Sequence, residues 1–117
     1  MTFYRFPIRI FNHNFEIHKN DVYPWTSFPH MHSIEDNLVL NIYTGEVYRK
    51  ITRDCIGEAR DKDMRKLWND KKFLSIVIEA RHNKLINFKN LEDISYNWIN
   101  EENLNGVKES DKSQFKT

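Results

Sequence analysis

Alternation of apolar and polar residues around a glycine is the feature that most constrains the fold of this chain. Apolar side chains occupy every second position at Leu38, Leu40 and Ile42, and the alternation resumes after Gly45. A period of two is typical of a β-strand, in which successive side chains point to opposite faces. A turn residue between two such runs predicts a β-hairpin, here over residues 36–52.

The N-terminal segment repeats this alternation and predicts a first hairpin. Apolar residues alternate with arginines over residues 4–11, and residues 15–18 supply the returning strand. The polar residues 12–14 between them are typical of a turn. Two prolines and three aromatic residues predict an irregular, extended loop over residues 19–30. Residues 53–60 are expected to link the second hairpin to a helix.

Beyond residue 60 the apolar residues adopt the spacing of a helix. Met64, Leu67 and Leu74 lie on one face at this spacing. Asp61 or Asp63 is placed to cap the helix, because a carboxylate accepts hydrogen bonds from the free N–H groups of the first turn. The sequence therefore predicts that the helical part of the fold begins close to residue 61.

The later part of the chain is less regular. Asn69-Asp70 predicts a break in the helix. Residues 73–79 are apolar on nearly all sides, which fits a buried strand or a helix, and we favour the helix because residues 81–84 continue a polar face. Residues 90–98 predict a short final helix. Residues 104–117 predict a disordered acidic and polar tail.

These elements predict an α+β fold, in which a small antiparallel sheet of two hairpins packs on two or three C-terminal helices. We expect residues 1–103 to form a single globular domain. The chain of 117 residues contains sixteen aromatic side chains, each of which buries roughly 150–250 Å². This aromatic content can supply a core without a metal ion or a disulfide bond.

Charge and hydropathy exclude several classes of protein. Eighteen basic residues against 17 acidic ones give a net charge of +1, which argues against a strongly basic nucleic-acid binder. The mean hydropathy is −0.74, and no run reaches the roughly 18 apolar residues of a membrane span. Arg5, Pro7 and Arg9 interrupt the segment where a secretory signal would be apolar, so we expect a cytoplasmic protein without membrane contact.

The sequence also lacks the common motifs of cofactor sites. It contains no glycine-rich phosphate-binding loop, and neither the HExxH nor the CxxC spacing of metal sites. The single cysteine, Cys55, cannot form an internal disulfide, and we expect a buried thiol. We therefore expect no cofactor and no resident metal ion.

Charge is unevenly distributed along the chain. Residues 61–90 carry eight basic and four acidic side chains, whereas residues 91–117 carry three and six. Four of the basic residues fall on one face of the predicted helix: Lys62, Arg65, Lys66 and Lys72. This stripe could contact nucleic-acid phosphates, or it could be the solvated face of an amphipathic helix. The neighbouring aspartates favour the solvated face.

The Pro-His-Met-His step at residues 29–32 contains the candidate catalytic residues. In an extended segment His30 and His32 point to the same face, so their imidazoles would lie side by side. Such a pair can ligate a metal ion, act as general acid and base in RNA cleavage, or pack structurally on Trp25 or Phe28. The side chains that could complete a metal site are Glu16, His18, Glu35 and Asp36. A structural or partner-binding role is favoured over either form of catalysis.

Aromatic and basic side chains near these histidines predict a binding surface. Its candidate residues are Trp25, Phe28, Tyr43, Tyr48 and Arg49. Aromatic rings beside cations stack on nucleic-acid bases, and the same residue types dominate protein–protein interfaces. We favour a protein partner, with nucleic acid reached through that partner or through the basic helix face. A homodimer is left open.

The histidine step, the second hairpin and the helical region follow one another in a defined order. The segments are Phe28-Pro29-His30-Met31-His32, residues 38–43, Gly45-Glu46-Val47 and a helix ending near residues 81–85. This order resembles a family of small bacterial domains of unknown function, which carry a Pro-Pro-His-x-His step, a hairpin, a Gly-Glu turn and one or two helices. The resemblance implies a setting, because members are often encoded in small gene pairs on mobile elements, like toxin–antitoxin modules.

The function that the sequence favours is a small accessory protein of a mobile element or phage, which binds a macromolecular partner. Asn, Ile and Lys supply 36 residues and Ala, Gly and Pro only eight, a bias typical of AT-rich coding DNA. Such a protein would be a toxin–antitoxin-like component or an inhibitor of a host system rather than an enzyme. The alternative is a small ribonuclease toxin, or a metal-dependent form of it, with His30 and His32 as acid and base. Arg49 or Lys50 would then hold the phosphate.

Overall fold

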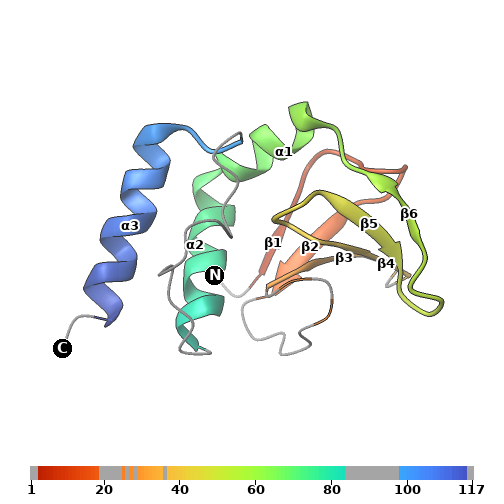
Figure 1. Cartoon of the computed structure of the whole chain (residues 1–117), viewed down its shortest axis with the longest axis horizontal. Coiled ribbons are helices and arrows are strands. Elements are labelled where there is room, and N and C mark those ends of the chain that lie inside the picture. The colour runs from red at the N-terminus through yellow and green to blue at the C-terminus, as the bar shows by residue number, and fades with distance from the viewer. Residues whose placement is uncertain are drawn as a thin grey trace.

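The computed structural model describes residues 3–18, 25, 27, 29–35, 37–83 and 98–115. Within these residues six strands are followed by three helices, and the helices lie to one side of the sheet (Figure 1). The strands are β1 (Phe3–Arg5), β2 (Phe15–His18), β3 (Met31–Ser33), β4 (Leu38–Leu40), β5 (Glu46–Arg49) and β6 (Cys55–Glu58). The helices are α1 (Asp61–Trp68), α2 (Lys71–Asn83) and α3 (Glu101–Phe115). The predicted α+β class is confirmed.

Each strand pairs antiparallel with the next one along the chain, so the sheet runs in space from β1 to β6. The hairpin predicted over residues 36–52 is confirmed as β4 and β5. Its turn is fixed by the side-chain carbonyl of Asn41, which accepts hydrogen bonds from the N–H groups of Tyr43 and Thr44 at 2.9 and 3.2 Å. Gly45 completes the turn with a φ of +82°, a left-handed conformation that glycine adopts without steric cost.

The first predicted hairpin is confirmed as β1 and β2, although β1 is shorter than the strand expected over residues 4–11. It ends at Arg5, because Pro7 has no N–H group with which to continue the ladder. The N–H of Phe6 still donates to the carbonyl of Phe15, at 2.9 Å. Phe6, between the end of β1 and the proline, is therefore still hydrogen-bonded to β2 without being part of the strand.

The turn of this first hairpin lies one position earlier than predicted. Phe11 and Asn12 occupy its centre, with φ of +50° and +62°, and Ile10 and His13 exchange two backbone hydrogen bonds around it. A left-handed φ is unfavourable for phenylalanine. The ring of Phe11 lies over Gly57 of β6, where an added Cβ atom would come within 2.8 Å of it.

β6 replaces the linker expected at residues 53–60. The chain reverses after β5, where the N–H of Arg53 donates to the carbonyl of Arg49, and the N–H of Arg49 donates to the carbonyl of Asp54. Arg53 adopts a left-handed φ of +65° in this reversal. The linker prediction is wrong because β6 is too short to show a clear alternation, and it becomes a strand only by pairing with β5.

The helical region begins where predicted, but its caps differ. α1 follows Arg60, and neither Asp61 nor Asp63 caps it through a side-chain hydrogen bond. The buried carboxylate of Asp63 instead accepts a hydrogen bond from Arg60 at 3.2 Å. Asp70 caps α2, because its Oδ1 accepts hydrogen bonds from two N–H groups of the first turn at 2.8 and 3.2 Å. The predicted break before α2 and the helix over residues 73–79 are confirmed.

The core lies between α1, α2 and one face of the sheet, which we call the inner face. The buried side chains of the inner face include Tyr4, Phe15, Ile17, Met31, Leu40 and Val47. Those of the helices include Met64, Leu67, Trp68, Phe73 and Ile76. The indole N–H of Trp68 donates to the carbonyl of Ile42 at 2.8 Å. This large ring is therefore buried with its one polar group hydrogen-bonded.

Arg81 departs from the polar face predicted for residues 81–84, because its side chain is buried. Its Nη1 donates a hydrogen bond to the hydroxyl of Tyr43 at 2.8 Å. The ring of Tyr43 in turn packs on Trp68, with centroids 5.9 Å apart. A buried guanidinium is costly unless it is hydrogen-bonded, and a tyrosine distant in sequence supplies part of that compensation.

α3 replaces the disordered tail expected over residues 104–117. It packs against α2 and buries Leu104 and Val107, which lie on the same face because they are three residues apart. The side chain of Asn100 caps it by accepting a hydrogen bond from an N–H of the first turn at 2.8 Å. The final helix predicted over residues 90–98 lies almost wholly outside the described residues.

Candidate functional site

The side of the sheet opposite the core, which we call the outer face, carries mainly polar and aromatic residues, together with the buried Val39. Cross-strand pairing sets one row of neighbours over β1 to β5: Arg5, Glu16, His32, Val39 and Tyr48. Their positions alternate with those of the core residues, so they project from the side away from the helices. His18 follows Glu16 by two residues and shares this face.

Three side chains of the outer face form what we call the Glu–His–His cluster: Glu16, His18 and His32. The Oε1 of Glu16 lies 3.3 Å from the Nε2 of His18. The imidazoles of His18 and His32 are stacked, with centroids 5.5 Å apart and planes 7° apart. One candidate ligand atom from each residue lies within 4.8 Å of the other two.

Neighbouring groups fix the orientation of the cluster. Arg5 donates a hydrogen bond to the Oε2 of Glu16 at 3.5 Å, so that Oε1 is left facing His18. The ring of Phe3 stacks on His18 from the adjacent strand, at a centroid distance of 5.5 Å. The side chains of Glu16 and His18 are 16% and 41% exposed. The cluster is therefore braced from β1 and still open to solvent on the His18 side.

His30 and His32 lie next to each other as predicted, with ring centroids 6.4 Å apart and planes at 61°. Their environments differ, because His30 is only 5% exposed whereas His32 is half-buried on the outer face. Two of the four side chains considered as further metal ligands, Glu16 and His18, join His32. Glu35 is exposed in the turn after β3, and Asp36 lies outside the described residues.

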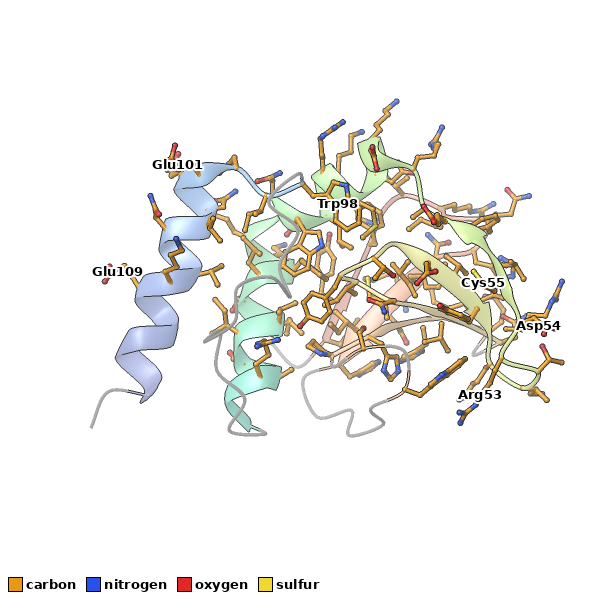
Figure 2. All side chains as sticks on the ribbon, in the orientation of Figure 1. Arg53, Asp54, Cys55, Trp98, Glu101 and Glu109 are labelled. Atoms are coloured by element: carbon orange, nitrogen blue, oxygen red, sulfur yellow. The ribbon has the colours of Figure 1, made fainter. Side chains whose placement is uncertain are left out.

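A second group of side chains gathers on the β5–β6 hairpin, and we call it the hairpin-tip surface: Trp25, Tyr48, Arg49, Ile51 and Arg53. The rings of Trp25 and Tyr48 meet edge to face at a centroid distance of 5.6 Å. The guanidinium of Arg53 lies over the ring of Trp25, 4.6 Å from its centroid. Figure 2 shows Arg53 at the end of the molecule farthest from α3.

The structure groups only part of the predicted binding residues. Trp25 and Tyr48 are in contact, and Arg49 is exposed at the end of β5. Tyr43 was expected to be exposed beside the histidines, but it packs against the core on the helix side. Its hydroxyl accepts a hydrogen bond from Arg81, and its ring packs on Trp68. Phe28 lies outside the described residues.

Two residues of the hairpin-tip surface were not predicted. Ile51 was assigned to a strand, and Arg53 to a linker. The structure places both in the reversal between β5 and β6, and Ile51 is 93% exposed. The turn-forming Asp54 is the one local signal of this reversal, and the strand after it has no pattern of its own.

The remaining candidates lie apart from both groups. The basic residues of the predicted stripe are exposed, with Lys62, Arg65 and Lys66 on α1 but Lys72 on α2. Cys55, expected to be buried, is exposed on β6 and lies 3.6 Å from the carbonyl of Gly57 (Figure 2). Its place on an edge strand explains the difference.

At the hairpin-tip surface the surroundings of Tyr48 change the pKa of its hydroxyl. Partial desolvation, followed by its hydrogen bond to Glu46 at 3.1 Å and the charge of that carboxylate, raises the pKa of the Tyr48 hydroxyl. This hydroxyl is therefore a neutral hydrogen-bond donor across the ordinary pH range.

Comparison with known proteins yields no relative: no protein-family profile, curated protein or solved structure matches this chain. Among the helices in the described part of the chain, none combines the length and apolar character that crossing a bilayer requires.

Proposed function

We propose that this chain is a small accessory protein that acts by binding a protein partner, in the mobile-element or phage setting that its sequence predicts. The observation that carries the proposal is Ile51, an isoleucine that is 93% exposed on a hairpin that also carries a Trp–Arg stack. Burying such a side chain in an interface contributes roughly 1.5–3 kcal/mol.

The residue types around Ile51 support the same proposal. Trp, Tyr and Arg are the residues most enriched among those that dominate binding energy at interfaces. Arg53 and Tyr48 both contact the ring of Trp25, so this side chain is held in place before any partner arrives. An ordered anchor loses less conformational entropy on binding than a free one.

Charge at the hairpin tip favours an acidic partner. Arg49, Lys50 and Arg53 lie within five positions of one another, and Asp54 is the acidic residue beside them. An excess of positive charge steers a negatively charged surface toward the hairpin and sets its orientation. We therefore expect a protein with an acidic patch around an apolar pocket.

The test is co-purification from cells that express the tagged chain together with its native neighbouring genes. Ile51→Asp should reduce the recovered partner by more than about tenfold, because it places a carboxylate where an apolar contact forms. Ile34→Asp is the matched control, since Ile34 is another exposed isoleucine, 42% exposed after β3, and it should retain the partner. Equal recovery with both variants contradicts the proposal.

A ribonuclease is the second candidate, and the contact between the rings of His30 and His32 favours it. Purified protein would then cleave RNA, and His30→Ala and His32→Ala would each abolish cleavage in protein that remains folded. His13→Ala serves as the control because His13 lies in the β1–β2 turn. Intact RNA after incubation with the purified chain removes this candidate.

A further inference from the structure

We propose that the Glu–His–His cluster is a binding site for a divalent transition-metal ion of the zinc class. The ligands are Oε1 of Glu16, Nε2 of His18 and an imidazole nitrogen of His32. The site is separate from the hairpin-tip surface and goes beyond the proposed binding function.

The spacing of the ligand atoms fits such an ion. Two ligand atoms bound tetrahedrally to Zn²⁺ at about 2.0–2.1 Å lie about 3.3 Å apart. The Oε1 of Glu16 and the Nε2 of His18 are 3.3 Å apart. The atom from His32 lies within 4.8 Å of both, and metal binding requires the nearly parallel rings of His18 and His32 to rotate until their in-plane lone pairs converge.

The choice of residues indicates the class of metal. Imidazole nitrogens favour zinc, copper, iron, cobalt and nickel over magnesium and calcium, which prefer oxygen ligands alone. Two histidines and one carboxylate leave at least one coordination position for water, as in catalytic rather than structural zinc sites. The partial exposure of His18 places that open position on the solvent side.

Groups around the cluster form hydrogen bonds that orient the candidate ligands. Metal-binding imidazoles usually donate their other N–H to a carbonyl or carboxylate, and ligating carboxylates are themselves hydrogen-bonded. The Nδ1 of His32 lies 3.3 Å from the carbonyl oxygen of Ser33, which favours the tautomer that carries its proton on Nδ1 and its lone pair on Nε2. Arg5 holds the second oxygen of Glu16.

The strand register makes the arrangement rigid. Glu16 and His32 are direct cross-strand partners in the β2–β3 pair, and His18 shares the strand and face of Glu16. An ion pair between Glu16 and His18 would account for their contact alone. It would not account for a third ligand-type side chain with a candidate ligand atom within 4.8 Å of both.

The experiment is calorimetric titration of the full chain with Zn²⁺ and with Co²⁺, whose visible spectrum reports coordination geometry. We expect one ion per chain, a cobalt spectrum of low coordination number and a melting temperature that rises with metal concentration. His32→Asn and Glu16→Gln should each weaken binding by more than about tenfold. His13→Asn is the matched control and should bind as the unaltered chain does.

The outcomes are separable from folding and from partner binding. Near-ultraviolet circular dichroism checks that each variant is folded, and Glu16→Gln, which keeps the shape of the side chain, serves if His32→Asn unfolds. Ile51→Asp should leave metal affinity unchanged, so loss of the partner does not bear on the metal site. Absence of Zn²⁺ and Co²⁺ binding, or binding unaffected by both ligand variants, overturns the proposal.

Discussion

The inner and outer faces of the sheet are built from the same strands but depend on different properties of their side chains. Phe15 and Ile17 of β2 point into the core and are fully buried. Glu16 and His18 alternate with them, point to the outer face and lie beside His32 of the neighbouring strand β3. The inner face requires apolar side chains of suitable volume, whereas the outer face requires particular partners at particular register positions.

This difference predicts different responses to substitution. A change on the inner face should act on the free energy of unfolding, because it leaves a cavity or an unpaired polar group. A change on the outer face should act on binding and leave stability nearly unchanged. The three predictions that follow test the core between the inner face and the helices, including two polar groups of the inner face.

Trp68→Ala should have the largest effect. The fully buried indole and its hydrogen bond to Ile42 are lost together, and the cost should be about 3–5 kcal/mol in urea-induced unfolding. Trp25→Ala is the matched control on the outer face, where contacts with the Tyr48 ring and the Arg53 guanidinium are removed, and should cost about 1 kcal/mol or less. Equal losses would erase the distinction between the faces.

Ser33→Ala tests a polar residue on the inner face. The buried Oγ of Ser33 accepts hydrogen bonds from the N–H groups of Asn37 and Leu38 at 3.1 and 3.0 Å. Alanine removes the acceptor, and the cost should be about 1–3 kcal/mol. Ser75→Ala, at an exposed position of α2, should stay within about 0.5 kcal/mol. A neutral Ser33→Ala would show that the inner face depends on volume alone.

Tyr4→Phe should cost about 0.5–1.5 kcal/mol at neutral pH, since Tyr4 donates a hydrogen bond to Asp70 at 2.9 Å. Burial, followed by the hydrogen bond and charge of Asp70, raises the pKa of Tyr4 above its ordinary value of 10.0. The unfolded chain therefore releases this proton first, and the contribution of Tyr4 is complete below pH 10 and lost as the pH rises further.

Denaturant titrations at several alkaline pH values measure this effect. The unfolding free energies of the unaltered chain and of Tyr4→Phe should differ by a constant amount below pH 10 and converge above it. A difference in unfolding free energy that stays constant into the alkaline range would mean that Tyr4 has the same pKa in the folded and unfolded chain.

Elements with a local pattern could be predicted from the sequence. The β4–β5 hairpin follows from period-two spacing around Gly45, and the start of the helical region follows from the helical spacing of Met64, Leu67 and Leu74. β6 could not be predicted in this way, because its strand character comes from pairing with β5. The burial of Arg81 could not be predicted either, because it depends on a hydrogen bond to Tyr43, 38 positions away. No local sequence pattern indicates that contact.

The candidate site shows the same division. The proximity of Glu16 and His18 follows from their separation by two residues on one strand. Their contact with His32 depends on the register of β2 with β3, which the long loop between those strands hides from sequence reasoning. The sequence therefore offered Glu16 and His18 as candidate ligands beside the histidine pair, and the register of the sheet places them next to His32 on the outer face.

The contact between Phe11 and Gly57 has a consequence for the order in which the chain folds. Every neighbouring pair in the sheet is consecutive in sequence, so all pairs except β2–β3 can form by closing a short loop, which is fast. Phe11 reaches β6 only when all the intervening strands are in place, because it joins the first hairpin to the last strand. We expect this closure to follow the rate-limiting step, so that it slows unfolding and leaves the folding rate unchanged.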